Sequence, residues 1–327
     1  MCIRDRQQTM EKIKKVGWIG IGRMGSPMVQ KVLESGYKVA IWNRTRSKAE
    51  ALTPYGVEIV SNPEELSKVD VLFTMVSTGQ DLEQVCFGEK GVIRENQSPR
   101  ILVDCSSIGA DQSTVIREKL SQRNCQLLAA PVSGNGKCVK SGKLSSVVSG
   151  PKEAFDAVES IIKAYSVQGV SYVGEGELAR FCKIAHNVLL AVVTQNLAEI
   201  TVLAEKAGIT RQAFLSFINN SVMGSIFSRY KTPAFVNLDW TTTFTPYLLR
   251  KDVDLGLEEA RELNVSMPVT AAAREALQTH FGAAQTKEDP EAYLSSDFSA
   301  LLETVAAQAG ITLKSENKTV PTGLEVE

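Results

Sequence analysis

The sequence predicts an α/β domain, a mostly parallel sheet with helices on both faces, followed by an all-α domain, with one long helix joining the two. Short apolar segments alternate with amphipathic segments from Lys14 to Val173, which is typical of a parallel sheet with crossover helices. Residues 178 to 206 then contain neither glycine nor proline, as expected of one long helix. Only helical periodicity follows them.

Each expected element rests on its own periodicity and flanking residues. Buried strands and amphipathic helices alternate in the first part, and Gly36 ends the first helix. The expected strands are 14–22, 37–43, 57–60, 70–76, 101–106 and 125–133, with further β-rich sequence to 173. The expected helices between them are 24–35, 45–55, 62–69, 81–87 and 111–123. After the long helix, which Gly208 stops, helices are expected at 211–220, 246–264, 268–282 and 299–310.

Composition bounds the class of protein. The 327 residues suggest about two domains. A net charge of −1, from 36 basic and 37 acidic side chains, argues against a nucleic-acid partner. The longest apolar stretch, around Val188 to Val193, is interrupted by Thr194, so no membrane partner is expected. Six cysteines without a CxxC pair predict reduced, mostly buried thiols in a cytoplasmic protein.

A glycine-rich loop directly follows the first expected strand and opens the first expected helix. Its sequence is Gly20-Ile21-Gly22-Arg23-Met24-Gly25, a GxGxxG pattern. In such a loop the first glycine permits the tight turn, the second lets a pyrophosphate approach the backbone, and the third lets the helix pack on the strand. The free N–H groups of the helix N-terminus then favour the phosphates. This context indicates a Rossmann-like dinucleotide-binding domain.

The end of the second strand indicates which dinucleotide is bound. NAD enzymes usually carry an acid here for the ribose hydroxyl, whereas this chain has Asn43-Arg44-Thr45. We expect no carboxylate to repel a 2′-phosphate, and Arg44 and Thr45 can both bind one. The sequence therefore predicts NADP, with NAD as the weaker alternative.

The predicted domains follow from these segments. We expect an NADP-binding domain over 10–173, a helical substrate and dimerisation domain over 174–313, and a disordered tail over 314–327. The first nine residues lack the apolar segment of a secretory signal. We expect them to be an extension that precedes a start at Met10.

Four further motifs follow the glycine loop in a fixed order. They are DCSSIGA (104–110), APVSGNGK (130–137), KIAHN (183–187) and RKDVDL (250–255). Together with GWIGIGRMGSPM they resemble the β-hydroxyacid dehydrogenases, from about Lys14 to Gly310. This family includes 3-hydroxyisobutyrate dehydrogenase, tartronate semialdehyde reductase and the glyoxylate/succinic semialdehyde reductases.

The resemblance implies a set of site residues. It places Val76, Ser77, Ser107 and Lys251 beside the cofactor, with Lys251 also close to the substrate. Ser133, Gly134 and Asn135 would form the loop that binds the substrate carboxylate, Lys183 would be the catalytic residue, and Asn187 would bind the substrate. Asn135 and His186 differ from the family's usual residues.

The residues themselves agree with this chemistry. Lys183 and Asn187 are four positions apart on a helix and therefore project from one face. A lysine among apolar helix neighbours suits a proton donor and acceptor. Ser133 with the N–H groups of the next two residues can bind a carboxylate. With two histidines in the chain, no metal site is expected.

The sequence thus predicts an NADP(H)-dependent oxidoreductase that interconverts a small 3-hydroxy or 2-hydroxy carboxylate and its semialdehyde, as a homodimer or homotetramer. Two alternatives remain. An imine reductase on this fold would not need Lys183, and a non-catalytic dinucleotide-binding module would not need Lys183 or Ser133. Assays with a cyclic imine and with semialdehydes would distinguish these three possibilities.

Overall fold

The structure, a computed structural model, describes residues 13–326. The predictions for residues 1–9, for Met10 and for Cys2 lie outside these residues. The chain divides into two compact units, the first ending at Lys183 and the second beginning at Ile184. This division falls inside the long helix, whereas the sequence analysis places the boundary before it, after residue 173.

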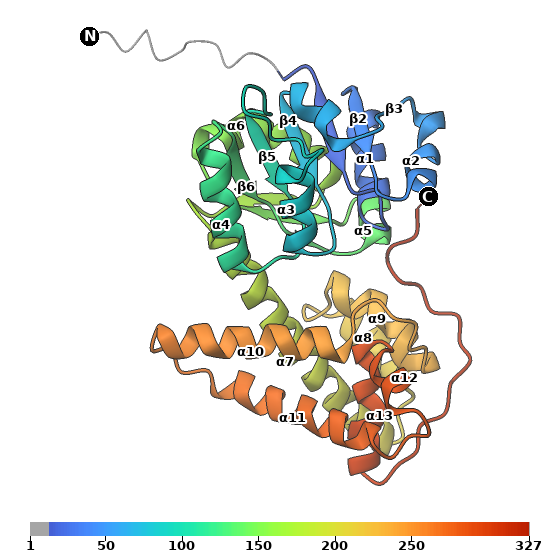
Figure 1. Cartoon of the computed structure of the whole chain (residues 1–327). Helices are drawn as coiled ribbons and strands as arrows, with labels where there is room; N and C mark the ends of the chain where they lie inside the picture. Colours follow the sequence, from blue (N-terminus) through green and yellow to red (C-terminus); the bar gives the residue numbers. More distant parts are fainter. Residues whose placement is uncertain (1–12, 327) are drawn as a thin grey trace. The chain divides into compact units, whose positions relative to one another are not determined.

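The first unit is built on a six-stranded sheet in which all neighbouring strands are parallel (Figure 1). Its order is β3-β2-β1-β4-β5-β6, the order of a dinucleotide-binding Rossmann fold. The strands are β1 (Val16–Ile19), β2 (Val39–Trp42), β3 (Glu58–Ile59), β4 (Val71–Thr74), β5 (Ile101–Asp104) and β6 (Gln126–Ala129). The residues of β1, β4 and β5 are all buried, as strands covered on both faces require. The predicted fold class is confirmed.

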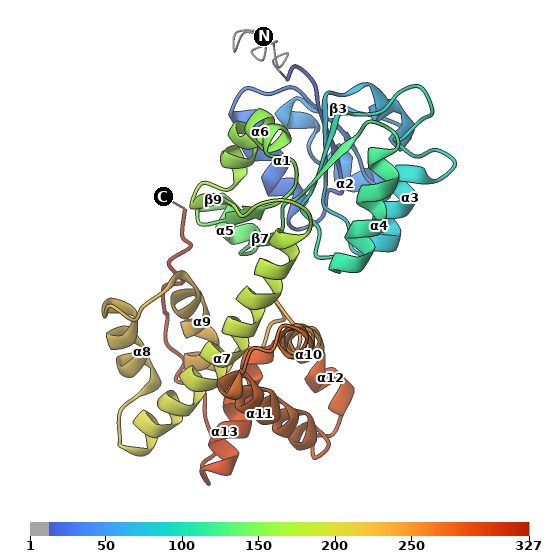
Figure 2. The ribbon, with the colours of Figure 1, turned by 90° about the vertical axis from the view of Figure 1, so that its left-hand side faces the viewer.

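Helices cover both faces of this sheet. They include α1 (Gly25–Glu34), α2 (Arg46–Glu50), α3 (Gly79–Phe87) and α4 (Ala110–Ser121). In Figure 2, α1 and α6 (Lys152–Tyr165) lie on one side of the strands and α4 on the other. Two expected helices are shorter and partly 3-10: η2 (Thr53–Tyr55) and η3 (Pro63–Lys68). Pro54 would lie inside the expected helix 45–55, where its missing N–H and its ring break the helix, so η2 is separate from α2. Pro63 begins η3, a first-turn position that proline tolerates.

A second, three-stranded sheet follows β6, in the order β7-β8-β9. It comprises β7 (Val132–Ser133), β8 (Ser145–Val148) and β9 (Gly169–Tyr172), with α5 (Gly136–Lys140) between β7 and β8. The sequence analysis expected only β-rich sequence here and missed α6. Its apolar residues recur at helical spacing and are buried, from Ala154 to Tyr165, but the β-rich segments on either side obscured the pattern.

The second unit contains only helices and a 3-10 turn among its described elements. The joining helix α7 (Leu178–Lys206) has the predicted bounds. The others are α8 (Arg211–Asn220), α9 (Ile226–Asn237), α10 (Pro246–Glu262), α11 (Pro268–Ala284), α12 (Pro290–Leu294), η4 (Phe298–Ala300) and α13 (Leu301–Gln308). The sequence analysis missed α9, which has Pro233 in its interior, and the single-turn α12.

Helix α7 is the one described helix that is long and apolar enough to cross a membrane by length and composition. Its most apolar 18-residue window has a mean hydropathy of 1.5, and 50% of that window is buried inside the structure. The sequence analysis considered only the shorter apolar stretch around residues 188–193. A core helix of a globular domain meets the same criterion, so length and composition alone are weak evidence for a membrane span.

The C-terminal segment after α13 has neither helix nor strand over residues 314–326, but hydrogen bonds tie it to the second unit. Both carboxylate oxygens of Glu316 accept from backbone N–H groups at the start of α8, at 2.7 and 3.0 Å. The Arg211 guanidinium donates to the Lys314 carbonyl at 2.5 Å. The sequence predicted a disordered tail here. In the structure, these hydrogen bonds hold the segment against the start of α8.

The core of the second unit contains a neutral histidine. His280 of α11 is fully buried, and its Nδ1 lies 2.8 Å from Thr304 Oγ1 on α13. Its Nε2 is buried without a hydrogen-bond partner among the described residues. Burial lowers the pKa of His280 from 6.5 to about 4, and the Lys287 ammonium adds to this shift. The folded protein therefore resists protonation at a pH where the unfolded chain accepts a proton.

We predict that this histidine makes the second unit acid-sensitive. As the pH falls from about 6.5 to about 4, the unfolded state takes up a proton that the folded state refuses, so about 3 kcal/mol of stability is lost. The loss should be absent in His280→Gln. Urea denaturation at pH 7 and pH 4.5 would measure it as the difference between the two proteins, and equal acid sensitivity in both would contradict the prediction.

Candidate functional site

The predicted cofactor residues of the first unit follow its parallel strands. The segments after β1, β2, β4 and β5 leave the same edge of the sheet, because parallel strands end on the same side. Residues 20–25, 43–45, 76–77 and 107 all lie in these segments. The structure therefore brings the predicted cofactor residues of this unit to one edge, the usual position of a ligand in an open α/β sheet.

The glycine loop fits a pyrophosphate. Gly20 has φ +99°, and a Cβ there would lie 2.0 Å from the carbonyl oxygen of Met75. A Cβ on Gly25 would lie 1.9 Å from the Gly20 carbonyl oxygen. At Gly22, by contrast, a Cβ would meet nothing within 4 Å, so the backbone is open to a ligand there. The first and third glycines thus serve close packing, and the second leaves space for phosphates beside the N-terminus of α1.

Asn43, which follows β2, has a local role. Its Oδ1 accepts a hydrogen bond from the Ile21 N–H at 2.8 Å, and its Nδ2 donates to the Thr45 carbonyl at 2.8 Å. The side chain thereby ties the glycine loop to the segment that carries Arg44. Asn43 was predicted to contact the cofactor, and these bonds show it supporting two other predicted cofactor segments.

The surroundings of Arg44 correct one expectation. The sequence analysis expected no carboxylate near the predicted 2′-phosphate site, because residues 43–47 contain none. In the structure, Asp81 of α3 lies there, with Oδ1 3.3 Å from Arg44 Nη1. The error arose because Asp81 is distant in sequence and only the parallel order of β2, β1 and β4 brings α3 near.

A buried hydrogen-bond network joins the ends of β4 and β5. Asp104 is fully buried, and its Oδ1 accepts from Thr74 Oγ1 at 2.8 Å and from Ser106 Oγ at 2.7 Å. Ser106 Oγ in turn accepts from the Val76 N–H at 2.9 Å. These bonds fix the segments in which the predicted cofactor residues Ser77 and Ser107 are exposed.

The same aspartate binds the first turn of α7. Arg180 is 2% exposed, and its Nη2 lies 2.5 Å from Asp104 Oδ2. Its Nη1 donates to the Ser106 carbonyl at 2.6 Å. Lys183, the predicted catalytic residue, is half-buried and lies one turn after Arg180 on this helix. The buried pair therefore holds the turn that precedes Lys183 at the carboxyl end of β5.

A second ion pair supports this start of the helix. Arg117 of α4 binds Glu177, the residue before α7, with Nε 2.6 Å from Oε1. Its Nη2 also donates to the Gly176 carbonyl at 2.8 Å. Ser149 Oγ also accepts from the Ala179 N–H at 2.9 Å. Arg117 and Ser149 therefore both fix the entry into α7.

The predicted carboxylate loop follows β7. Ser133 is its last residue, and Gly134 has φ +129°, where a Cβ would lie 2.8 Å from the Cβ of Cys138. Asn135 caps α5, because its Oδ1 accepts from the N–H groups of Lys137 and Cys138 at 3.0 and 3.1 Å. The amide oxygen of Asn135 thus shapes the loop, so a contact with substrate would fall to its Nδ2.

The second unit holds the other predicted substrate residues. Asn187 is 8% exposed, and its Nδ2 donates to Asp252 Oδ2 at 2.7 Å. Its Oδ1 lies 2.9 Å from His186 Nδ1. Since this oxygen can only accept, His186 must carry its proton on Nδ1. Lys251 is exposed, with Nζ 3.6 Å from Asp252 Oδ1. Asp252 therefore joins Asn187 and Lys251 in one charged cluster.

Comparison with known proteins places this geometry in a family. Residues 15–174 match the family of the NAD binding domain of 6-phosphogluconate dehydrogenase, and residues 177–296 match a family described as NAD-binding of NADP-dependent 3-hydroxyisobutyrate dehydrogenase. A probable mitochondrial 3-hydroxyisobutyrate dehydrogenase-like protein of Arabidopsis thaliana is 32% identical over 248 residues, 75% of this chain and 77% of the relative. This chain belongs to the β-hydroxyacid dehydrogenase family.

One further relative agrees with that membership, and one solved structure shares the fold. The chloroplastic glyoxylate/succinic semialdehyde reductase 2 of Arabidopsis thaliana is 28% identical over 295 residues, 89% of this chain and 79% of the relative. The crystal structure of a 3-hydroxyisobutyrate dehydrogenase from Salmonella typhimurium shares the fold, with a TM-score of 0.73 at 22% identity over 88% of this chain and 98% of that one. The chain is accordingly an oxidoreductase of an NAD(P)-binding family.

Several candidate functional residues of this chain were missed by the sequence analysis. They are Asp81, Asp104, Ser106, Arg180 and Asp252. Three of them lie in the quoted motifs: Asp104 and Ser106 belong to DCSSIGA, and Asp252 follows Lys251 in RKDVDL. For Arg180 the signal was a charge three residues before Lys183 in an apolar helix. Its partner could not be inferred from spacing.

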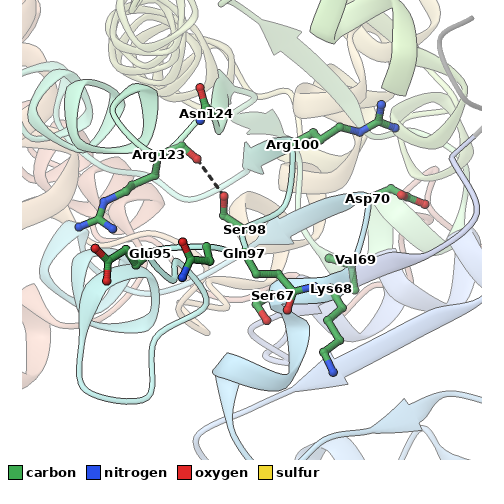
Figure 3. A pocket seen from close by; sticks show the side chains of 11 residues that line it. Ser67, Lys68, Val69, Asp70, Glu95, Gln97, Ser98, Arg100, Arg123 and Asn124 are labelled. Carbon is green, nitrogen blue, oxygen red and sulfur yellow. Dashed lines mark hydrogen bonds between the residues drawn. The ribbon is translucent and has the colours of Figure 1, made fainter.

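A separate depression of about 570 Å³ lies at the opposite edge of the sheet (Figure 3). Asp70 and Arg100 line it, and each directly precedes a strand, β4 or β5. Its basic side chains, Lys68, Arg100 and Arg123, point in different directions in Figure 3 and do not converge on one point. None of the predicted site residues lines this depression. Among residues 13–326, no three metal-ligating side chains gather into a possible metal site.

We predict that removing Arg180 destabilises the first unit strongly. Arg180→Met leaves Asp104 buried without its cation, which should lower the free energy of unfolding by about 3–5 kcal/mol. The double variant Arg180→Met/Asp104→Asn should recover part of this loss, since the uncompensated charge is gone. Thermal unfolding followed by circular dichroism would measure both.

The matched control is Arg46→Met, which removes an exposed i,i+4 pair with Glu50. It should change stability by no more than about 0.5 kcal/mol. An Arg180→Met protein as stable as this control would show that the buried pair does not hold α7.

Proposed function

We propose that this β-hydroxyacid dehydrogenase uses NADP(H) to interconvert a small 3-hydroxy or 2-hydroxy carboxylate and its semialdehyde, with Lys183 as general acid and base. The observation that carries the proposal is the position of Lys183. It lies one turn beyond Arg180, whose guanidinium is bound to Asp104 at the end of β5. A proton donor on this turn would therefore lie near the sheet edge that carries the predicted cofactor residues.

The glycine loop and the ends of β2, β4 and β5 would hold the cofactor. Gly22 leaves room for the pyrophosphate, while Arg44 and Thr45 would bind the 2′-phosphate. Ser77 and Ser107 are exposed beside the fixed network of Asp104. When bound, the nicotinamide cofactor supplies or accepts the hydride.

Lys183 would supply the proton that the hydride transfer requires. Reduction of an aldehyde leaves negative charge on its oxygen, and an ammonium within hydrogen-bond reach both stabilises that charge and delivers a proton. In the oxidative direction the neutral amine would take the hydroxyl proton. Half-burial on α7 limits the competition from water at this nitrogen.

Substrate orientation would fall to polar groups around the lysine. Asn187 is four residues along the same helix, and Asp252 fixes its amide so that one Nδ2 proton remains for a substrate oxygen. Ser133 and the N–H groups after it would bind the carboxylate. The sequence relationship to a glyoxylate/succinic semialdehyde reductase supports a substrate of this class.

We further infer that the protein is a homo-oligomer, a dimer or tetramer. Leu189 and Leu203 of α7 are 61% and 70% exposed. Such side chains on an apolar helix are consistent with a protein interface.

Lys183→Met tests the catalytic assignment. The variant keeps the apolar stem and the helix propensity but removes the proton and the charge. We expect kcat to fall by about 10² to 10⁴, with NADPH affinity near normal, as measured by steady-state kinetics and by fluorescence titration of the cofactor.

Lys206→Met is the matched control, because Lys206 ends the same helix and donates to the Ala309 carbonyl. It should keep wild-type kcat. A Lys183→Met enzyme with more than about a tenth of wild-type kcat would show that the proton comes from another group, and His186 would be the next residue to test.

A substrate panel tests the carboxylate requirement. Glyoxylate and succinic semialdehyde should be reduced with a far higher kcat/KM than propanal or benzaldehyde, because only the acids can occupy the loop at Ser133. Turnover of all four with similar kcat/KM would refute this role of the loop. Reduction of a cyclic imine in preference to every aldehyde would favour an imine reductase.

A further inference from the structure

We infer that Asp81 weakens binding of the cofactor's 2′-phosphate, and so sets how strongly the enzyme selects NADP(H) over NAD(H). This inference rests on the proposed cofactor site, in which Arg44 faces the 2′-phosphate. It concerns a residue outside every predicted site segment. Three properties of Asp81 matter here: its contact with Arg44, its fixed position and its charge.

The contact joins two segments that are distant in sequence. Arg44 follows β2, and Asp81 lies in the first turn of α3, after β4. Arg44 Nη1 and Asp81 Oδ1 are 3.3 Å apart. The arginine side chain is 80% exposed and the aspartate 32%. A phosphate bound by this guanidinium would therefore lie within a few ångströms of a carboxylate.

Asp81 is the fixed partner of the two. Its Oδ2 accepts from Thr78 Oγ1 at 2.9 Å, and its backbone N–H donates to the same hydroxyl at 3.0 Å. These reciprocal bonds cap the N-terminus of α3. The carboxylate consequently stays in place when a ligand arrives, whereas the exposed arginine can turn toward a phosphate.

The charges at the end of β2 are balanced before any cofactor binds. Arg46, the other arginine of this segment, has Nε 3.0 Å from Glu50 Oε1. Arg44 is paired with Asp81. A phosphate monoester carries a charge of about −1.5 to −2 near neutral pH, so the 2′-phosphate meets no net positive charge from these two pairs. Arg44 must leave or share its carboxylate to bind it.

Asp81 could instead help by holding Arg44 ready for the phosphate, but the geometry favours repulsion. The contact is single and exposed, and such pairs contribute little to ordering a side chain. The negative charge, by contrast, acts on the phosphate through space wherever the arginine points. The two roles predict opposite effects of removing the charge.

The experiment measures binding without turnover. Isothermal titration calorimetry with 2′,5′-ADP, 5′-AMP, NADPH and NADH would be carried out on the full-length wild type and on Asp81→Asn. The asparagine can still accept from Thr78, so the cap of α3 is kept. We expect Kd for 2′,5′-ADP and NADPH to fall by about three- to tenfold. Kd for 5′-AMP and NADH should stay unchanged, and about 1 M salt should reduce the effect.

Glu83→Gln is the matched control. It removes the same charge from the same helix, but Glu83 pairs with Lys119 of α4 rather than with Arg44. Its Kd values should equal those of the wild type. An equal gain in both variants would show that overall charge, and not the position of Asp81, controls affinity.

The remaining outcomes separate the inference from the proposed function. Weaker 2′,5′-ADP binding by Asp81→Asn would overturn the inference and show that Asp81 positions Arg44. Unchanged binding would also overturn it. Arg44→Ala should abolish the preference for 2′,5′-ADP over 5′-AMP. A wild type that binds neither dinucleotide would instead refute the proposed cofactor site, and the inference with it.

Discussion

The buried ion pair between Asp104 and Arg180 is the contact on which the candidate site depends. Each partner is almost inaccessible to water, so neither charge is tolerable without the other. Asp104 also accepts from Thr74 and Ser106, which fixes the ends of β4 and β5 together. Arg180 extends this fixed network to the first turn of α7, and Lys183 is one turn further on. Removing either charge would therefore disturb the cofactor edge and the proposed proton donor at once.

Beyond this pair, several polar side chains hold neighbouring segments of the predicted site in place. Asn43 supports the glycine loop, Asn135 caps the helix after the carboxylate loop, and Asp252 orients Asn187. Such supporting contacts reduce the conformational freedom of the groups that bind or react. Preorganised groups of this kind lower the barrier to reaction. Polar side chains in these motifs consequently carry two kinds of role, and spacing alone does not separate them.

Ion pairs make the predicted cofactor edge less basic than its local sequence indicates. Arg44 and Arg46 suggest a strongly basic phosphate site, yet each is paired with a carboxylate in the structure. Exposed pairs of this kind stabilise the fold little, so their effect on a dianionic ligand is their main consequence. On our proposal, selectivity between the two dinucleotides depends on a carboxylate contributed by α3 as well as on the arginines.

The sequence by itself determined the α/β order, the bounds of α7, the glycine loop and the family motifs, because periodicity and glycine spacing are local properties. It missed α6, whose helical pattern lies between strands, and α9, which contains Pro233. Only the tertiary structure decided which charges meet. Asp81 reaches Arg44, and Asp104 reaches Arg180, across 37 and 76 residues of chain. Strand order sets such pairings, and it is a property of the whole sheet that no short segment encodes.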